Sequence, residues 1–151
     1  MNYDRWKRCL TQYAAAALNH LIQLFSNILL GPMELNSAIN ESEELIQWLD
    51  RNIDGIEIKS DDRSKIAGAC LDVVLEHQKA IVLLSAHKLY GSAAALVRSV
   101  FESYVRGVWF YYSASNQEIE KFKKQDKLNK NFHKLIEDLE KHEFFSEGIL
   151  S

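Results

Sequence analysis

Residues 61–112 read DDRSKIAGACLDVVLEHQKAIVLLSAHKLYGSAAALVRSVFESYVRGVWFYY and contain two long helical patterns. Before Gly91, apolar residues recur three and four positions apart, which is typical of one buried helix face. After Gly91, apolar residues occupy nearly all sides, which indicates a helix at the centre of its domain. A glycine is a common helix end, and Ser92 can cap a new helix. We therefore predict an antiparallel helical hairpin from about Asp61 to Tyr112, with its turn at Gly91.

The rest of the chain also favours helices. Only one proline and six glycines occur in 151 residues, so long helices are more plausible than many short strands. Periodic apolar residues and capping side chains predict four further helices. They cover residues 3–30, residues 36–52, a segment that begins near residue 115, and residues 131–142. Residues 56–58 alternate like a strand, but three residues cannot make a sheet alone. The predicted fold class is all-α, an up-and-down helical bundle centred on the hairpin.

Two features bear on domain organisation. Gly31-Pro32 ends the first helical pattern, so we expect residues 1–32 to be an N-terminal helix, which either packs on the core or serves as an extension or docking arm. We expect residues 33–151 to form the helical bundle domain. Ser146 stands where it could cap another helix, yet the chain stops at Ser151, so we expect a C-terminally truncated domain.

Composition restricts the class of protein. The net charge of −3 indicates neither a nucleic acid nor a membrane as an obligatory partner. No stretch reaches the roughly 18 apolar residues of a membrane span, and no signal peptide is evident. Cys9 and Cys70 have no metal-ligand spacing and suit a reducing compartment, although a disulfide between them stays an alternative. We expect a cytoplasmic protein without a metal or a cofactor.

Charge is distributed unevenly along the chain. Nine acidic and two basic residues give residues 31–62 a sum of −7, and several lysines cluster between Lys121 and Lys134. The acidic block is read as a solvated helix face with acidic first turns. The lysine cluster could be an RNA-binding patch, but the interspersed carboxylates favour a solvated face.

The strongest candidate site is a charged cluster in the second half of the hairpin. Arg98, Glu102 and Arg106 are four residues apart and so share one side of a helix. Because their neighbours on that side are apolar, we expect these charges to be half-buried, which requires pairing. Equal counting from Gly91 puts His77 level with Glu102 and Arg106. The four residues predict either a polar pocket for an anion or for acid–base chemistry, or an ion-pair network that fixes how the helices pack.

The pattern Leu96-x-Arg98-x-x-Phe101-Glu102-x-x-x-Arg106-Gly107-x-Trp109 resembles the signature helix of small uncharacterised bacterial helical proteins, known as domains of unknown function. The resemblance covers about residues 35–151. More distantly, the chain is similar to the HEPN superfamily, whose active members are ribonucleases of toxin and defence systems. Their motif, an arginine, then four to six residues, then a histidine, matches no arginine of this sequence. Of the family's motif residues, the resemblance therefore identifies only Arg98, Glu102 and Arg106 in this chain. It implies no role for any of these three residues.

We therefore expect a non-catalytic helical interaction or sensing module. The resemblance implies that this module belongs to a bacterial defence or toxin–antitoxin system. A homo-oligomer or a protein partner is expected. The alternatives are a HEPN-like ribonuclease, or a binder of small anions or nucleotides, that uses the Arg98, Glu102 and Arg106 cluster with His77.

Overall fold

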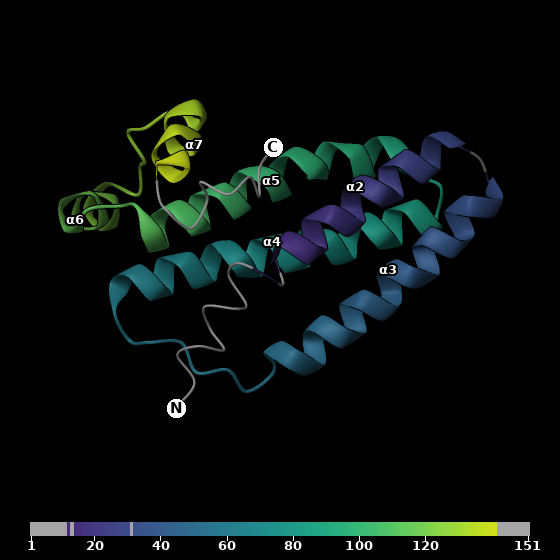
Figure 1. The fold of residues 1–151 in the computed structure, drawn as a ribbon, viewed down its shortest axis with the longest axis horizontal. Helices are drawn as coiled ribbons and strands as arrows, with labels where there is room; N and C mark the ends of the chain where they lie inside the picture. Colours follow the sequence, from purple (N-terminus) through teal and green to yellow (C-terminus); the bar gives the residue numbers. More distant parts are fainter. Residues whose placement is uncertain (1–11, 13, 31, 142–151) are drawn as a thin grey trace.

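The computed structural model describes residues 12, 14–30 and 32–141, and all of its regular elements are helices. They are α2 (Ala14–Leu30), α3 (Pro32–Ile53), α4 (Asp62–Ala86), α5 (Tyr90–Tyr112), α6 (Asn116–Gln125) and α7 (Phe132–Glu140). Figure 1 shows α4 and α5 side by side, with α3 beyond α4 and with α6 and α7 at the end away from the α4–α5 turn. The all-α prediction is confirmed. Residues 56–58 lie in a loop, since no neighbouring strand pairs with them in the described part.

The antiparallel pair of α4 and α5 is the centre of the bundle, as predicted. On α4, buried residues recur every three or four positions, from Ala67 through Leu71, Val74 and Ile81. Gly107 on α5 lets the two backbones approach closely, because an added Cβ would lie 3.0 Å from the Cβ of Cys70. Gly107 thus has a packing role at the contact between α4 and α5.

The turn between α4 and α5 lies three residues earlier than expected. Helix α4 ends with the Leu89 amide donating to the Leu84 carbonyl and the Lys88 amide donating to the Ser85 carbonyl. This is the hydrogen-bond pattern of a Schellman motif. Lys88 has a φ of 61° at the left-handed position that glycine usually occupies. The prediction that Gly91 ends the first helix is therefore wrong, because local hydrogen bonds stabilise the turn at Lys88 and Gly91 is already helical.

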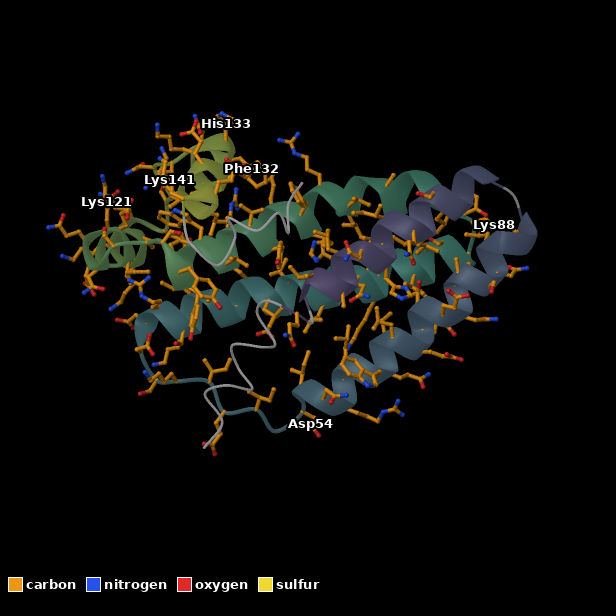
Figure 2. The ribbon with its side chains drawn as sticks, in the orientation of Figure 1. Asp54, Lys88, Lys121, Phe132, His133 and Lys141 are labelled. Carbon is orange, nitrogen blue, oxygen red and sulfur yellow. The ribbon has the colours of Figure 1, made fainter. Side chains whose placement is uncertain are left out.

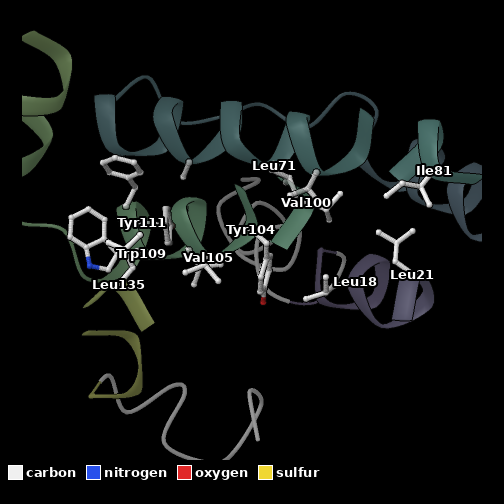
Figure 3. Close-up of a cluster of buried hydrophobic side chains, with 14 of the residues drawn as sticks. Leu18, Leu21, Leu71, Ile81, Val100, Tyr104, Val105, Trp109, Tyr111 and Leu135 are labelled. Atoms are coloured by element: carbon white, nitrogen blue, oxygen red, sulfur yellow. The ribbon is translucent and has the colours of Figure 1, made fainter. Parts of the chain in front are cut away.

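Helix α2 covers the hairpin and contacts α3, α4 and α5. Its buried leucines, Leu18, Leu21 and Leu24, belong to the same core cluster as the α4 and α5 side chains. In Figure 3, Leu21 points toward Ile81 of α4. Residues 14–30 thus contribute to the core, whereas a domain boundary at residue 32 stays a prediction.

Helices α6 and α7 cover the C-terminal part of α5. The predicted cap at Ser115 is confirmed as a capping box with Glu118, and the Asn131 side chain caps α7. The rings of Phe101 and Phe132 lie 5.5 Å apart between centroids and join α5 to α7. The predicted helix after Ser146 and the cysteine at position 9 lie outside the described residues.

Candidate functional site

Arg98, Glu102 and Arg106 form the paired row on α5 that their spacing predicts. The Arg98 Nε donates to Glu102 Oε1 at 2.8 Å, and an Arg106 terminal nitrogen lies 3.5 Å from Glu102 Oε2. The expected half-burial is wrong for Arg98, whose side chain is 87% exposed, whereas it holds for Arg106, which is 50% exposed, and for Glu102, which is 25% exposed. The row lies on the side of α5 opposite the buried residues Ala93, Val100 and Tyr104, so the core does not reach it.

The row is an ionised surface feature. The hydrogen bond from Arg98 lowers the pKa of the Glu102 carboxyl below its usual value. Glu102 is therefore charged at neutral pH and is a weak proton acceptor there, because a general base works best when its pKa is near the operating pH. Pairs this exposed also stabilise a helix little.

His77 does not join the row. Cys70 faces Gly107 across the hairpin, and seven further steps along each antiparallel helix place His77 level with Val100. Val100 is buried on the opposite side of α5 from Arg98. Among the described residues, no hydrogen bond or ion pair links His77 to Arg98, Glu102 or Arg106. The expected level of His77 came from counting about Gly91, which is not the turn.

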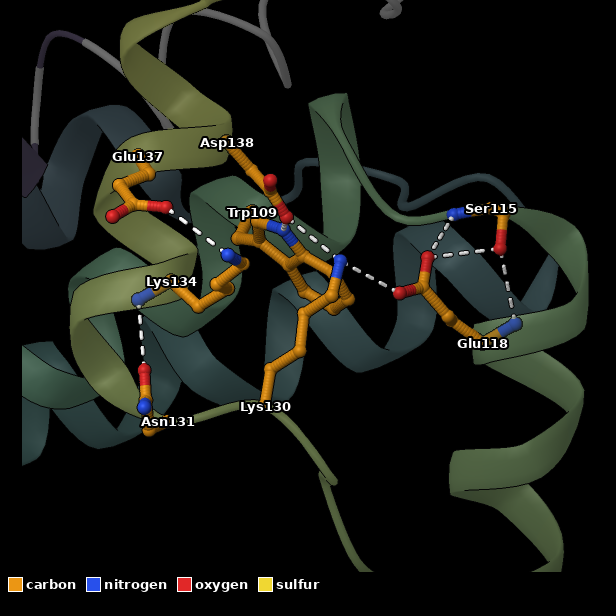
Figure 4. A network of polar contacts seen from close by, with 8 residues as sticks. All are labelled: Trp109, Ser115, Glu118, Lys130, Asn131, Lys134, Glu137 and Asp138. Carbon is orange, nitrogen blue, oxygen red and sulfur yellow. Dashed lines mark hydrogen bonds and ion pairs between the residues drawn. The ribbon is translucent and has the colours of Figure 1, made fainter.

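A second polar network, at the α5–α6–α7 junction, was not predicted from the sequence (Figure 4). The ammonium of Lys130 lies 2.8 Å from Glu118 Oε1, 2.7 Å from Asp138 Oδ2 and 4.8 Å from the centroid of the Trp109 ring. The Trp109 indole N–H donates to the same oxygen of Asp138 at 3.1 Å. The network satisfies the one polar atom of a tryptophan side chain that is 0% exposed, so its role is structural.

Arg63 of α4 is also structural. Its guanidinium donates to the carbonyls of Phe110 at 2.7 Å and Ala114 at 2.6 Å, where α5 ends. The last carbonyls of a helix have no partner within the helix. Arg63 supplies these partners and so fixes the exit of the chain toward α6. The sequence holds no local signal for this bond, since it spans 47 or more positions.

An open groove lies between α2 and α3, with a volume of about 530 Å³. Its walls carry two carboxylates, Glu41 and Glu44, the guanidinium of Arg51, and the ring of Trp48, which is 42% exposed. The sequence alone predicts only an acidic helix face here. Helix α2 closes one side of the groove through His20, so its shape depends on a packing contact that periodicity alone does not show.

Two further residue types bear on chemistry. Burial raises the pKa of the Cys70 thiol to about 11, against a smaller opposing effect of Arg106, so the thiol is protonated at neutral pH. Within the described ranges, no three His, Cys, Asp or Glu side chains come close enough together to hold a metal ion. In the same ranges, no helix has the length and apolar character to cross a membrane.

Fold and surface together define an all-α bundle protein whose candidate site is a helix face rather than an internal pocket. The chain belongs to a family of unknown function (DUF6988), whose model matches residues 71–150. The match includes most of α4 and all of α5, α6 and α7. Searches of curated proteins and of solved structures gave no match.

Proposed function

We propose that this protein is a non-catalytic helical interaction module that binds through the outward side of α5. We call this surface the α5 face; it consists of Gly91, Ala94, Ala95, Arg98, Glu102 and Arg106. The observation that supports the proposal is the combination of an uncovered helix side with small residues at its N-terminal half. Small side chains let a second helix approach closely, and the charged row beside them can set its register.

The surroundings of the α5 face support a contact surface. Leu89, the residue that precedes α5, is 52% exposed. Exposed apolar side chains next to a polar row are typical of protein–protein contacts. Toward the other end, Trp109 lies on the same side of α5 but is covered by the Lys130 network. The α5 face therefore ends where α7 begins.

The partner we propose is a second copy of the chain, in the cytoplasm. Symmetric contacts between identical faces are the commonest route to a dimer. The row also suits such a contact, because one carboxylate and two guanidinium groups can exchange partners across a two-fold axis. A role in a bacterial defence or toxin–antitoxin system is part of the proposal and rests on the sequence resemblance alone.

The test is the mass of the protein in solution, measured by sedimentation velocity at micromolar concentration and above. Wild type is expected to form a dimer through the α5 face, and Ala95→Arg, which places a long charged side chain on that face, is expected to lose this dimer. Ala69→Arg is the matched control, because Ala69 is an equally small exposed residue on the outward side of α4. A monomeric wild type, or a dimer that Ala95→Arg leaves intact, would contradict the proposal.

One observation favours a second candidate, an anion or RNA site on the same row. Arg106 has only a long 3.5 Å contact and Arg98 is largely in solvent, so both guanidinium groups keep donors for a phosphate. This would agree with the distant HEPN resemblance, although the arginine–histidine motif is missing. Incubation of RNA with wild type and with Arg98→Ala decides: equal cleavage by both proteins, or cleavage by neither, eliminates the ribonuclease.

A further inference from the structure

The groove between α2 and α3 is partly apolar and has a small net negative charge, because one guanidinium, that of Arg51, opposes its two carboxylates. Glu41 and Glu44 stand three residues apart along α3, and Trp48 follows one turn later. All three side chains are exposed. Among the described residues, Glu44 has no hydrogen-bond or ion-pair partner, whereas Asp50, further along α3, is paired with Lys79 at 2.7 Å. We call the surface formed by Glu41, Glu44, Leu45 and Trp48 the acidic groove.

The opposite charge lies on α6. Its exposed lysines Lys121 and Lys124 are also three residues apart, and neither is part of any ion pair within the described residues. Their neighbour Lys123 differs, because it is held by Asp62 at 2.6 Å. Lys121 and Lys124 are thus the free cations of this helix, and we call them the α6 lysine pair.

The acidic groove and the α6 lysine pair cannot meet within one molecule. Figure 2 shows Lys121 at the end of the molecule away from Lys88, whereas α3 runs along another edge. Lys121 and Lys124 are separated along α6 by the same helical rise as Glu41 and Glu44 along α3, about 4.5 Å for three residues. The charges of one copy therefore match those of another copy in sign and in spacing.

We propose that the acidic groove binds the α6 helix of a second copy of this chain. Glu41 and Glu44 pair with the α6 lysine pair of that copy, and the aliphatic stems of these lysines lie on the Trp48 ring, where an ammonium also gains from the aromatic face. The two surfaces differ, so the contact is head-to-tail and propagates into chains or closes into rings. It belongs to the proposed class of interaction module but does not use the α5 face.

The contact has a clear signature in solution. It consists of exposed charge pairs around one aromatic ring, so it is weak and weakens further as salt screens the charges. Association of wild type should therefore rise with protein concentration at low salt and fall at least about tenfold at high salt. A dimer through the α5 face would stop at two copies, whereas the head-to-tail contact continues to larger assemblies.

The test uses charge reversal in full-length chains that also carry Ala95→Arg, so that association through the α5 face is blocked. One variant has Glu41→Lys and Glu44→Lys, and the other has Lys121→Glu and Lys124→Glu. Each should be monomeric alone, because it retains only one working surface and faces like charges at the other. An equimolar mixture should associate head-to-tail and grow, because the unaltered surfaces of the two variants pair with each other and so do their reversed surfaces.

A chain with all four reversals should associate again, which also shows that the reversals leave the fold intact. Glu76→Lys is the matched control, because it reverses an exposed carboxylate on α4 and should leave association unchanged. The proposal is overturned if the mixture stays monomeric, if the four-fold variant does not associate, or if high salt has no effect. If this test fails while the dimer that depends on Ala95 still forms, the proposed contact through the α5 face is unaffected. If the head-to-tail contact forms and that dimer does not, the acidic groove is the remaining contact surface.

Discussion

Gly107 and Gly91 lie on the same helix in very different surroundings. A Cβ at position 107 would be 3.0 Å from the Cβ of Cys70 and 3.4 Å from the carbonyl oxygen of Ala67. Both atoms are attached to the α4 backbone, so neither can move aside without shifting the helix. A Cβ at position 91 would meet nothing within 4 Å. The same substitution should therefore have opposite effects at the two sites.

We predict that Gly107→Ala lowers the free energy of unfolding by about 1 kcal/mol or more, because overpacking outweighs the gain in helix propensity. Gly91→Ala is the control and should raise it by up to about 1 kcal/mol, since alanine fits the helix better and restricts the unfolded chain. Urea unfolding followed by circular dichroism measures both. A stabilised Gly107→Ala protein would show that α4 and α5 are less closely packed than the 3.0 Å approach to Cys70 requires.

For the charged row of Arg98, Glu102 and Arg106, the sequence predicts the pairing of the side chains but not how far each of them is buried. Spacing correctly paired Arg98 with Glu102 and Arg106, since residues four apart on a helix are always neighbours. It could not show whether that side of the helix is covered. Trp109 lies on the same side and is fully buried, because α7 and Lys130 cover it, whereas nothing in the described part covers Arg98. Burial thus depends on contacts between distant segments.

At the scale of elements, helix ends were predictable where a side chain caps its own helix. Ser115 with Glu118 and Asn131 with the Lys134 amide are bonds over three residues, and sequence shows them directly. The α4–α5 turn was not predictable in this way. It places Lys88 in a left-handed conformation that two backbone hydrogen bonds support, while a glycine three residues later offered a stronger but misleading signal.

The Lys130 network joins three elements and has a pH-dependent consequence. The hydrogen bond from Lys130 lowers the pKa of Asp138 below its usual value. Burial alone would raise the pKa of Glu118, but hydrogen bonds from Lys130 and Ser115 outweigh it and lower this pKa also. Because both pKa values are lower in the folded state, the stabilisation is complete above the usual values of 3.8 and 4.5 and is lost as the pH falls below them.

We predict that Lys130→Met lowers the free energy of unfolding at neutral pH by about 1 kcal/mol, while methionine keeps the apolar stem on Trp109. The difference between wild type and this variant should stay constant down to about pH 5 and shrink below about pH 4. Lys134→Met is the control, because Lys134 is exposed and should change stability by less than about 0.5 kcal/mol. A difference that does not shrink in acid would mean that Lys130 acts through packing alone.

For the whole molecule, the open question is whether residues before Pro32 unfold together with the hairpin. Helix α2 buries Leu21 to 1% exposure in the core cluster, whereas its neighbour Ile22 is 57% exposed. If α2 belongs to one cooperative unit, Leu21→Ala should lower the global free energy of unfolding by about 2–4 kcal/mol, through lost burial and a cavity. Ile22→Ala, the adjacent control, should change it by less than about 0.5 kcal/mol.

The decisive measurement is thermal unfolding monitored by both calorimetry and circular dichroism. One cooperative unit gives a single transition, and Leu21→Ala shifts it to lower temperature at both probes. An independent arm would instead give an early α2 transition, with the main transition unchanged by Leu21→Ala. That second result would support an N-terminal extension ending near residue 32. It would also remove one wall of the acidic groove from the folded core, so the measurement bears directly on where a second copy can bind.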